Sequence, residues 1–198
     1  MPYEELLALV NARSGHFAFE SGHHSDGWLD LETICRTPGK LDPFITALAD
    51  RLAAYRPEVI CGPMVEGAFV GLMVAAKMRL DFVYAARFAP ESPAALFSVK
   101  YRIPPPLRST VAGTRVAVVN DFISAGSAVR GAFEHLQSLS ANIVAFASLA
   151  VLGDEFLRFA AERKLPVEAL LQKKLNLWEP AACPLCAQGV RLEHPANA

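Results

Sequence analysis

Residues 116–130 read VAVVNDFISAGSAVR, in which a valine-rich run is followed by an acidic residue, a loop of small residues and the start of a further segment. Short apolar runs bounded by turn residues are typical of buried strands, so we expect a strand over 115–119 and a helix over 127–139. The strand delivers Asp121 to its carboxyl end. There a carboxylate can accept hydrogen bonds from the vicinal hydroxyls of a ribose.

The loop from Asn120 to Ala128 has the composition of a phosphate site. Small side chains let phosphate oxygens approach backbone N–H groups, and a helix N-terminus adds free donors and partial positive charge. Ser124 and Ser127 can donate hydroxyl hydrogen bonds to the same phosphate. An ordinary strand–turn–helix with a capping serine fits the same residues and stays open as the alternative.

Strand-like and helix-like segments alternate along the rest of the chain. We expect helices over 3–13, 42–55 and 67–78, and strands over 28–31, 59–61, 82–86 and 143–151. This alternation predicts an α/β fold with a central, mostly parallel sheet flanked by helices. Ligands bind beyond the carboxyl ends of such strands, so the loops after Cys61, Arg87 and Val119 are expected on one rim.

Length and composition restrict the class of protein. The chain has 198 residues, of which 53% are hydrophobic, and this excludes a disordered protein. We divide it into one domain over 1–175 and a C-terminal tail with a Cys-x-x-Cys motif over 176–198. A net charge of −1 provides no general basic field for nucleic acid. An anionic substrate must therefore be bound by local features, such as helix N-termini and a few placed cations.

The remaining bulk features predict a cytoplasmic protein with reduced thiols and no membrane partner. The N-terminal residues lack the basic and apolar parts of a signal peptide, and no apolar run reaches membrane-spanning length. Four cysteines are too few for a disulfide scaffold in a chain of this size.

Residues 116–130 resemble the signature of the type I phosphoribosyltransferases, and they are especially similar to the version found in orotate phosphoribosyltransferases. Two further regions agree. Residues 17–25, FAFESGHHS, resemble a segment of the orotate enzymes, and residues 61–68, CGPMVEGA, resemble the family's pyrophosphate loop. Arg87 falls where that family has an arginine after its third strand. The resemblance covers about residues 5–150 in the right order, which matters more than any one motif.

The resemblance implies an enzyme of pyrimidine nucleotide metabolism with a small N-terminal hood region, acting as a homodimer. It would transfer a phosphoribosyl group from 5-phosphoribosyl-1-pyrophosphate (PRPP) to a nitrogenous base, with Mg²⁺ arriving as a chelate of PRPP. The implied 5-phosphate site is Ser124, Ala125, Gly126, Ser127 and Ala128; Asn120 and Asp121 face the ribose; Val65, Glu66 and Gly67 line the pyrophosphate, and Arg87 supplies positive charge.

Several positions depart from the family's pattern. The first acidic position of the signature is Asn120, and Glu66 stands near the pyrophosphate loop where the orotate enzymes have lysine. Lysines are also missing at 88–91 and in the loop at 94–104, where Lys100 and Arg102 are the nearest cations that could replace them in catalysis. Solvated loop residues remain the alternative for that pair.

Two questions about function therefore stay open. The orotate enzymes carry an arginine for the orotate carboxylate after the next strand, where this chain reads SLAVL at 148–152. We expect orotate to be a poor substrate and leave the base open. A non-catalytic regulatory protein that binds PRPP or a nucleotide is the alternative to an enzyme.

The histidines and cysteines suggest two further sites. His24 occupies the position of a substrate-contacting lysine in the orotate enzymes, although a solvated surface pair with His23 fits equally. Cys183 and Cys186 have the spacing of half a zinc site, to be completed by His194, Cys35 or another subunit, or else they are free thiols. Nothing in the sequence places this tail near the phosphate loop, so we expect zinc loss to leave donor binding unchanged.

Overall fold

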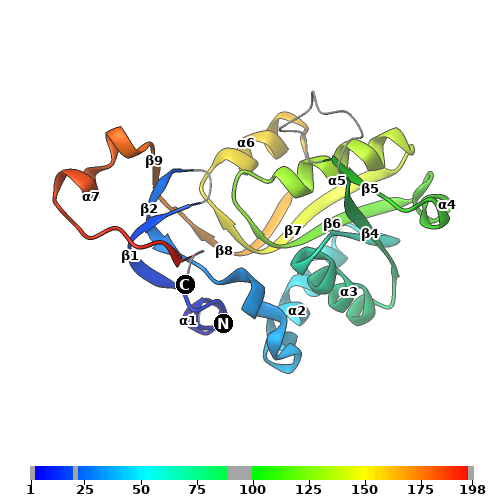
Figure 1. The fold of residues 1–198 in the computed structure, drawn as a ribbon. Coiled ribbons are helices and arrows are strands. Elements are labelled where there is room, and N and C mark those ends of the chain that lie inside the picture. Colours follow the sequence, from blue (N-terminus) through cyan, green and yellow to red (C-terminus); the bar gives the residue numbers. More distant parts are fainter. Residues whose placement is uncertain (1–2, 20–21, 89–99, 196–198) are drawn as a thin grey trace.

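The computed structural model describes residues 3–19, 22–88 and 100–195, and its centre is a six-stranded sheet (Figure 1). The strand order is β5-β4-β3-β6-β7-β8, with all neighbours parallel except β5, which runs antiparallel to β4. The bounds are β3 Val59–Pro63, β4 Asp81–Phe88, β5 Lys100–Arg102, β6 Arg115–Ile123, β7 Asn142–Leu152 and β8 Val167–Lys173. The predicted α/β class with a mostly parallel sheet is confirmed. Within the described ranges no helix is both long and apolar enough to cross a membrane.

Helices cover both faces of this sheet. The longer ones are α2 Pro38–Ala53 and α3 Glu66–Met78 on one face, and α5 Ser127–Ser138 and α6 Glu155–Glu162 on the other (Figure 1). Successive strand residues point to opposite faces, and β6 shows this directly. Val116 and Val118 pack with α5 and α6, whereas Ala117 and Val119 pack with α2 and α3. A short 3₁₀ turn, η2 Pro105–Leu107, and α4 Arg108–Val111 connect β5 to β6.

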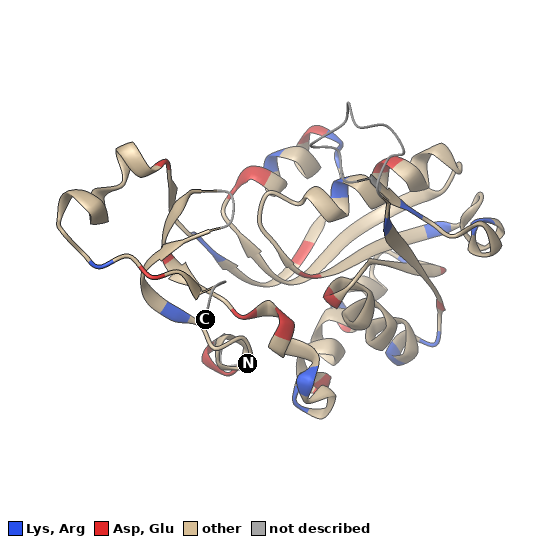
Figure 2. Cartoon of the chain, in the orientation of Figure 1, with Lys and Arg blue, Asp and Glu red and all other residues tan. Residues whose placement is uncertain are grey.

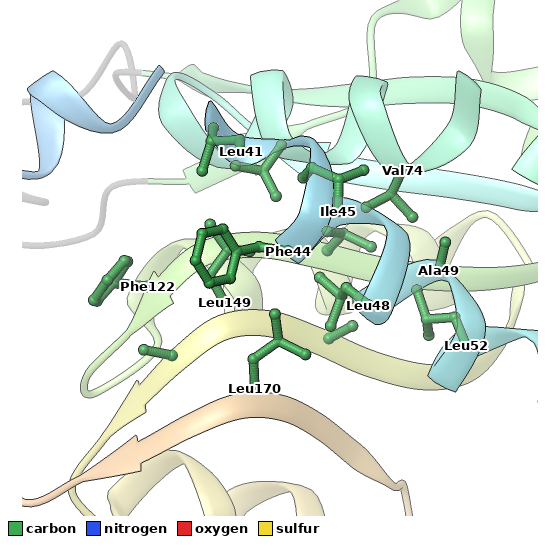
Figure 3. Packing of buried hydrophobic residues seen from close by; sticks show 14 of the residues in the cluster. Leu41, Phe44, Ile45, Leu48, Ala49, Leu52, Val74, Phe122, Leu149 and Leu170 are labelled. Atoms are coloured by element: carbon green, nitrogen blue, oxygen red, sulfur yellow. The ribbon is translucent and has the colours of Figure 1, made fainter. Parts of the chain in front are cut away.

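Helix α2 shows how the apolar pattern builds the core (Figure 3). Phe44, Ile45, Leu48 and Leu52 recur at helical spacing and are buried against the sheet. Figure 3 shows Phe44 beside Leu149, a residue of strand β7. Burying side chains of this size stabilises the fold by about 1.5–3 kcal/mol each, so α2 is firmly attached to the strands that carry the site.

A second, smaller sheet lies at one end of the molecule, on the left in Figure 1. Its order is β1-β2-β9, with β1 Arg13–Ala18, β2 His24–Trp28 and β9 Leu177–Trp178, all antiparallel. Helix α1 Tyr3–Leu9 precedes it and the 3₁₀ helix η1 Leu31–Arg36 follows the hairpin. The tail continues beyond β9 through η3 Pro180–Ala182 and α7 Pro184–Ala187. We call β1, β2 and residues 176–195 the hairpin–tail layer.

Several predicted boundaries were wrong. The first helix ends at Leu9 and not at residue 13, because Arg13 already pairs with Trp28 in the hairpin. The strand expected over 28–31 lies at 24–28, and a 3₁₀ helix starts at Leu31. Helix α2 begins at Pro38, four residues before the predicted start, because this proline fills the first helical position.

Candidate functional site

The candidate site lies along the edge of the sheet where β3, β4, β6 and β7 end. These strands are parallel, so their carboxyl ends meet at one edge. Two of the three predicted loops follow them directly, with residues 64–65 after β3 and residues 124–126 after β6, and the turn at 153–154 follows β7. The third predicted loop, after Arg87, falls on positions 89–99, outside the described residues. Figure 2 shows acidic and basic residues interspersed along the chain, so anion binding at this edge depends on local donors.

Asp121 lies inside β6, which continues to Ile123, so the strand is four residues longer than predicted. The carboxyl group is buried, and burial raises its pKa from 3.8 to about 7. Hydrogen bonds from the backbone N–H groups of Phe122 and of Asp121 itself act in the opposite direction, and the charge of Glu66 adds to the increase. A buried carboxyl group of this kind is a strong acceptor once it is ionised.

Asn120, near the end of β6, contacts the start of α3 through its side chain. Its Nδ2 donates a hydrogen bond to the carbonyl oxygen of Phe122 at 2.7 Å. Its Oδ1 lies where a Cβ on Gly67 would be, so any larger residue at 67 would collide with it. This close approach brings the segment Val65 to Gly67, expected to line a pyrophosphate, against the strand that carries Asp121.

The loop after β6 ends in a backbone conformation that glycine favours. Gly126 has φ +81° and caps α5, and a Cβ there would collide with the ring of Phe156. No side chain caps the first turn of α5, so its free N–H groups face the loop. Ser124 and Ser127 are exposed, whereas Ala125, Gly126 and Ala128 are half-buried. The geometry therefore provides hydroxyl and backbone donors at one helix N-terminus.

A pocket of about 380 Å³ adjoins this loop. Its walls come from Ser124 and Ala125, from the turn at 153–155, and from Asn176 and Leu177 of the tail. The sequence contains no signal for this proximity of the tail to the phosphate loop, and the expectation that zinc loss leaves donor binding largely unchanged stays a prediction. The tail reaches this pocket because the Asn176 amide donates to the Asp26 carboxylate, with Nδ2 to Oδ2 at 2.7 Å, beside the first residues of β9.

The predicted cations lie on the short β4–β5 pair. Arg87 is opposite Tyr101 and Phe88 is opposite Lys100, so residues 87 and 102 point to opposite faces of the pair. The guanidinium of Arg102 stacks 4.1 Å from the centre of the Phe88 ring. The structure does not bring Arg87 and Arg102 together, and the loop positions 89–99 lie outside the described residues.

His24 does not lie at the rim. It is buried in β2 with its Nδ1 3.0 Å from Nε2 of His16, and Sγ of Cys186 is 3.3 Å from the same Nδ1. His23 pairs instead with Glu179 at 3.0 Å. His16 was not among the residues that the sequence suggested. A hairpin prediction over 13–28 would have indicated it, because that pairing places His16 and His24 near each other on neighbouring strands.

The relatives and solved structures to which this chain is similar are phosphoribosyltransferases. No family model matches the chain. It is 27% identical over 193 residues to the orotate phosphoribosyltransferase of Caldanaerobacter subterraneus subsp. tengcongensis, covering 98% of this chain and 93% of the relative. The resemblance predicted from the motifs is thus confirmed over nearly the full length.

Solved structures show the same fold. The adenine phosphoribosyltransferase of Thermoanaerobacter pseudethanolicus superposes with a TM-score of 0.64 at 18% identity, over 86% of this chain and 99% of that one. The orotate phosphoribosyltransferase of Aeropyrum pernix gives 0.61 at 16% identity, over 81% and 87%. At these identities the structures support the fold alone.

Proposed function

We propose that this chain, which has the fold of the phosphoribosyltransferases, transfers a phosphoribosyl group from PRPP to a nitrogenous base in pyrimidine nucleotide metabolism. One observation carries the proposal: β6 presents the buried carboxyl of Asp121 directly before a loop of small residues at the uncapped N-terminus of α5. This arrangement offers an acceptor for ribose hydroxyls and donors for a phosphate at adjacent places.

Each part of the donor has a candidate partner. The 5-phosphate would bind residues 124–128, the ribose hydroxyls Asp121, and the pyrophosphate the segment Val65 to Gly67. In the reaction the bond from C1 of the ribose to the pyrophosphate oxygen breaks and a bond from C1 to a nitrogen of the base forms. Catalysis would consist of holding the two reactants in position and of stabilising the separating charges.

Mg²⁺ fits this site as a companion of PRPP. The carboxyl groups of Asp121 and Glu66 interact electrostatically across it, and carboxylate oxygens are ligands that this cation accepts. We propose that Mg²⁺ arrives chelated by the pyrophosphate and the ribose hydroxyls, where it neutralises charge on the leaving pyrophosphate. Asn120 contributes no charge there, and its amide is already bonded to the carbonyl of Phe122.

A turnover assay over a panel of bases tests the proposal. We expect PRPP-dependent release of pyrophosphate with at least one base, and we expect orotate to be a poor acceptor. Residues 148–152, where the orotate enzymes carry the arginine for the carboxylate, contain none, and the turn after β7 places Asp154 and Glu155 on the pocket wall. Arg158 and Lys174 also line this pocket, so efficient use of orotate would point to them as the replacement. If none of the bases in the panel supports pyrophosphate release, the proposed transfer is wrong. Efficient conversion of orotate would contradict only the argument about the acceptor.

A non-catalytic PRPP- or nucleotide-binding protein is the second candidate. The amide of Asn120, fixed on the carbonyl of Phe122, stands where the family signature has an acid, and this favours binding without turnover. PRPP binding in calorimetry without pyrophosphate release over the whole panel would select this candidate.

Donor binding should depend on pH near neutrality. The pKa of Asp121 is raised to about 7 in the folded protein, so the group is neutral below this pH and ionised above it. We expect PRPP affinity to increase as pH rises through about 7, because the ionised carboxylate is the better acceptor. Stability should change in the opposite sense: the folded state holds a proton that the unfolded state has lost between pH 3.8 and about 7, so stability falls as pH rises there.

Calorimetric titrations between pH 6 and pH 8 measure the affinity change, corrected with ribose 5-phosphate for the titration of the ligand's own phosphate. In Asp121→Asn this part of the pH dependence should disappear. An unchanged pH profile in that variant would show that another group is responsible.

We propose that the chain forms a cytoplasmic homodimer. Phe69 and Leu72 lie three residues apart on one side of α3, and they are 47% and 51% exposed. Aligned apolar side chains of this size on a surface helix are typical of protein–protein contacts. Light scattering should give a mass of about twice 21.4 kDa. A monomeric mass at micromolar concentration would contradict the dimer.

A further inference from the structure

Four side chains converge at the hairpin–tail layer: His16 of β1, His24 of β2, and Cys183 and Cys186 of the tail. One ligand atom from each lies within 4.8 Å of all the others. His16, His24 and Cys183 are buried and Cys186 is exposed. We propose that this cluster is a structural zinc site, which neither His194 nor Cys35 completes.

The distances within the cluster fit one tetrahedral ion. Zinc bonds of about 2.0–2.1 Å to nitrogen and about 2.3 Å to sulfur place two nitrogens about 3.3 Å apart and a nitrogen and a sulfur about 3.6 Å apart. The two histidine nitrogens are separated by 3.0 Å. The nitrogen–sulfur distances are 3.4 Å from His16 to Cys183, 3.8 Å from His16 to Cys186 and 3.3 Å from His24 to Cys186.

Hydrogen bonding alone does not account for this arrangement. Nδ1 of His16 is 2.9 Å from the carbonyl oxygen of Val190, which can only accept, so Nδ1 carries the proton of the neutral ring. Nε2 then has a single lone pair, yet it is approached by Nδ1 of His24 and by both sulfurs. A cation between them satisfies all four groups. A histidine that ligates a metal commonly donates its other N–H to a backbone carbonyl, as His16 does.

The surrounding layer has little other means of stabilisation. Among residues 171–195, Cys183 is the only buried residue. The contacts that hold the tail on the hairpin are polar: two residues of β9 pair with β2, the Ala18 N–H donates to the Glu193 carbonyl at 2.9 Å, and Asn176 and Glu179 pair with Asp26 and His23. Small units without an apolar core are usually stapled by a disulfide or a metal. Two imidazoles and two thiolates in tetrahedral array are a donor set that suits zinc.

The site is closed and therefore structural. The protein supplies all four ligands, which leaves no position for a substrate. Its role would be to hold the tail on the hairpin. Because Asn176 and Leu177 of the tail line the pocket beside Ser124, the metal would also steady one wall of the candidate site.

Elemental analysis of untagged protein, purified without added metal, is the first test. We expect one zinc ion per chain. Cys186→Ser removes an exposed ligand without disturbing the core. It should weaken zinc binding by more than about 100-fold, because removing a residue that merely hydrogen-bonds a metal ligand already costs about 10–100-fold in affinity. Cys35→Ser is the matched control, because this cysteine lies outside the cluster and its variant should keep the full zinc content.

Cobalt(II) exchange and proteolysis provide readouts that do not depend on activity. Cobalt should show the intense visible bands of a tetrahedral site and thiolate charge transfer. Chelation should expose the chain to trypsin after Lys174 and Arg191. Protein that lacks zinc and has both thiols reactive, a disulfide between the two cysteines, iron in place of zinc, or an octahedral cobalt spectrum would each overturn the proposal. If Cys186→Ser does not fold, the cobalt spectrum of the unmodified protein still tests the proposal.

Discussion

Replacing Asp121 with alanine is expected to weaken PRPP binding by about 100-fold or more while the protein stays folded, because hydrogen bonds to charged groups contribute roughly 1.5–3 kcal/mol each and a ribose offers two hydroxyls. The variant should not lose stability at pH 8. There the native protein buries an ionised carboxyl whose raised pKa shows that the folded state disfavours the charge. Calorimetry measures the affinity and thermal unfolding measures the stability.

The matched control for this variant is Asp81→Ala. Asp81 is an exposed carboxylate at the first residue of β4, so it lies at the opposite edge of the same sheet. Its loss removes the same formal charge and should leave PRPP affinity within about threefold, since surface charges at this distance are largely screened. If Asp121→Ala binds PRPP as tightly as the parent, the role assigned to the carboxylate is wrong.

Gly126→Ala should destabilise the protein by about 2–5 kcal/mol and remove donor binding. A left-handed conformation costs an alanine about 1–2 kcal/mol, and a methyl group forced against packed atoms typically costs 1–3 kcal/mol. Gly126 has φ +81° and its added Cβ would collide with the ring of Phe156. Relief of this collision would move the loop whose backbone donors are proposed to hold the phosphate.

Gly113→Ala separates the two costs. Gly113 has a similar φ of +73°, but a Cβ there would meet no atom within 4 Å, so only the conformational cost applies. Chemical unfolding of both variants should show the larger loss for Gly126→Ala, and Gly113→Ala should bind PRPP like the parent. Equal losses of stability would contradict the role of Phe156 in shaping the loop.

The unit at 115–139 could be predicted from the sequence because its signals are local. A valine-rich strand, a glycine and a helix lie within a single stretch. The length of β6 could not, because Asn120 and Asp121 are unfavourable strand residues. They are accommodated by contacts from elsewhere: the hydroxyl of Ser148 donates to the carbonyl of Asp121 at 2.7 Å, and Gly67 leaves room for Asn120.

The hairpin–tail layer was the least predictable part. Strand β2 pairs on one side with β9, a partner about 150 residues away, and no local pattern encodes such pairing. Cys183 and Cys186 were recognised by their spacing. Their neighbours His16 and His24 were not, because Cys183 and His16 are 167 positions apart in the sequence.

Calorimetric titration of the protein with PRPP and Mg²⁺ tests the central claim most directly, because it asks whether the loop after β6 holds a phosphoribosyl ligand at all. We expect saturable binding at one site per chain with a Kd well below about 1 mM, and a large loss of that binding in Asp121→Ala. No detectable heat at about millimolar PRPP, in protein shown to be folded, would contradict the account.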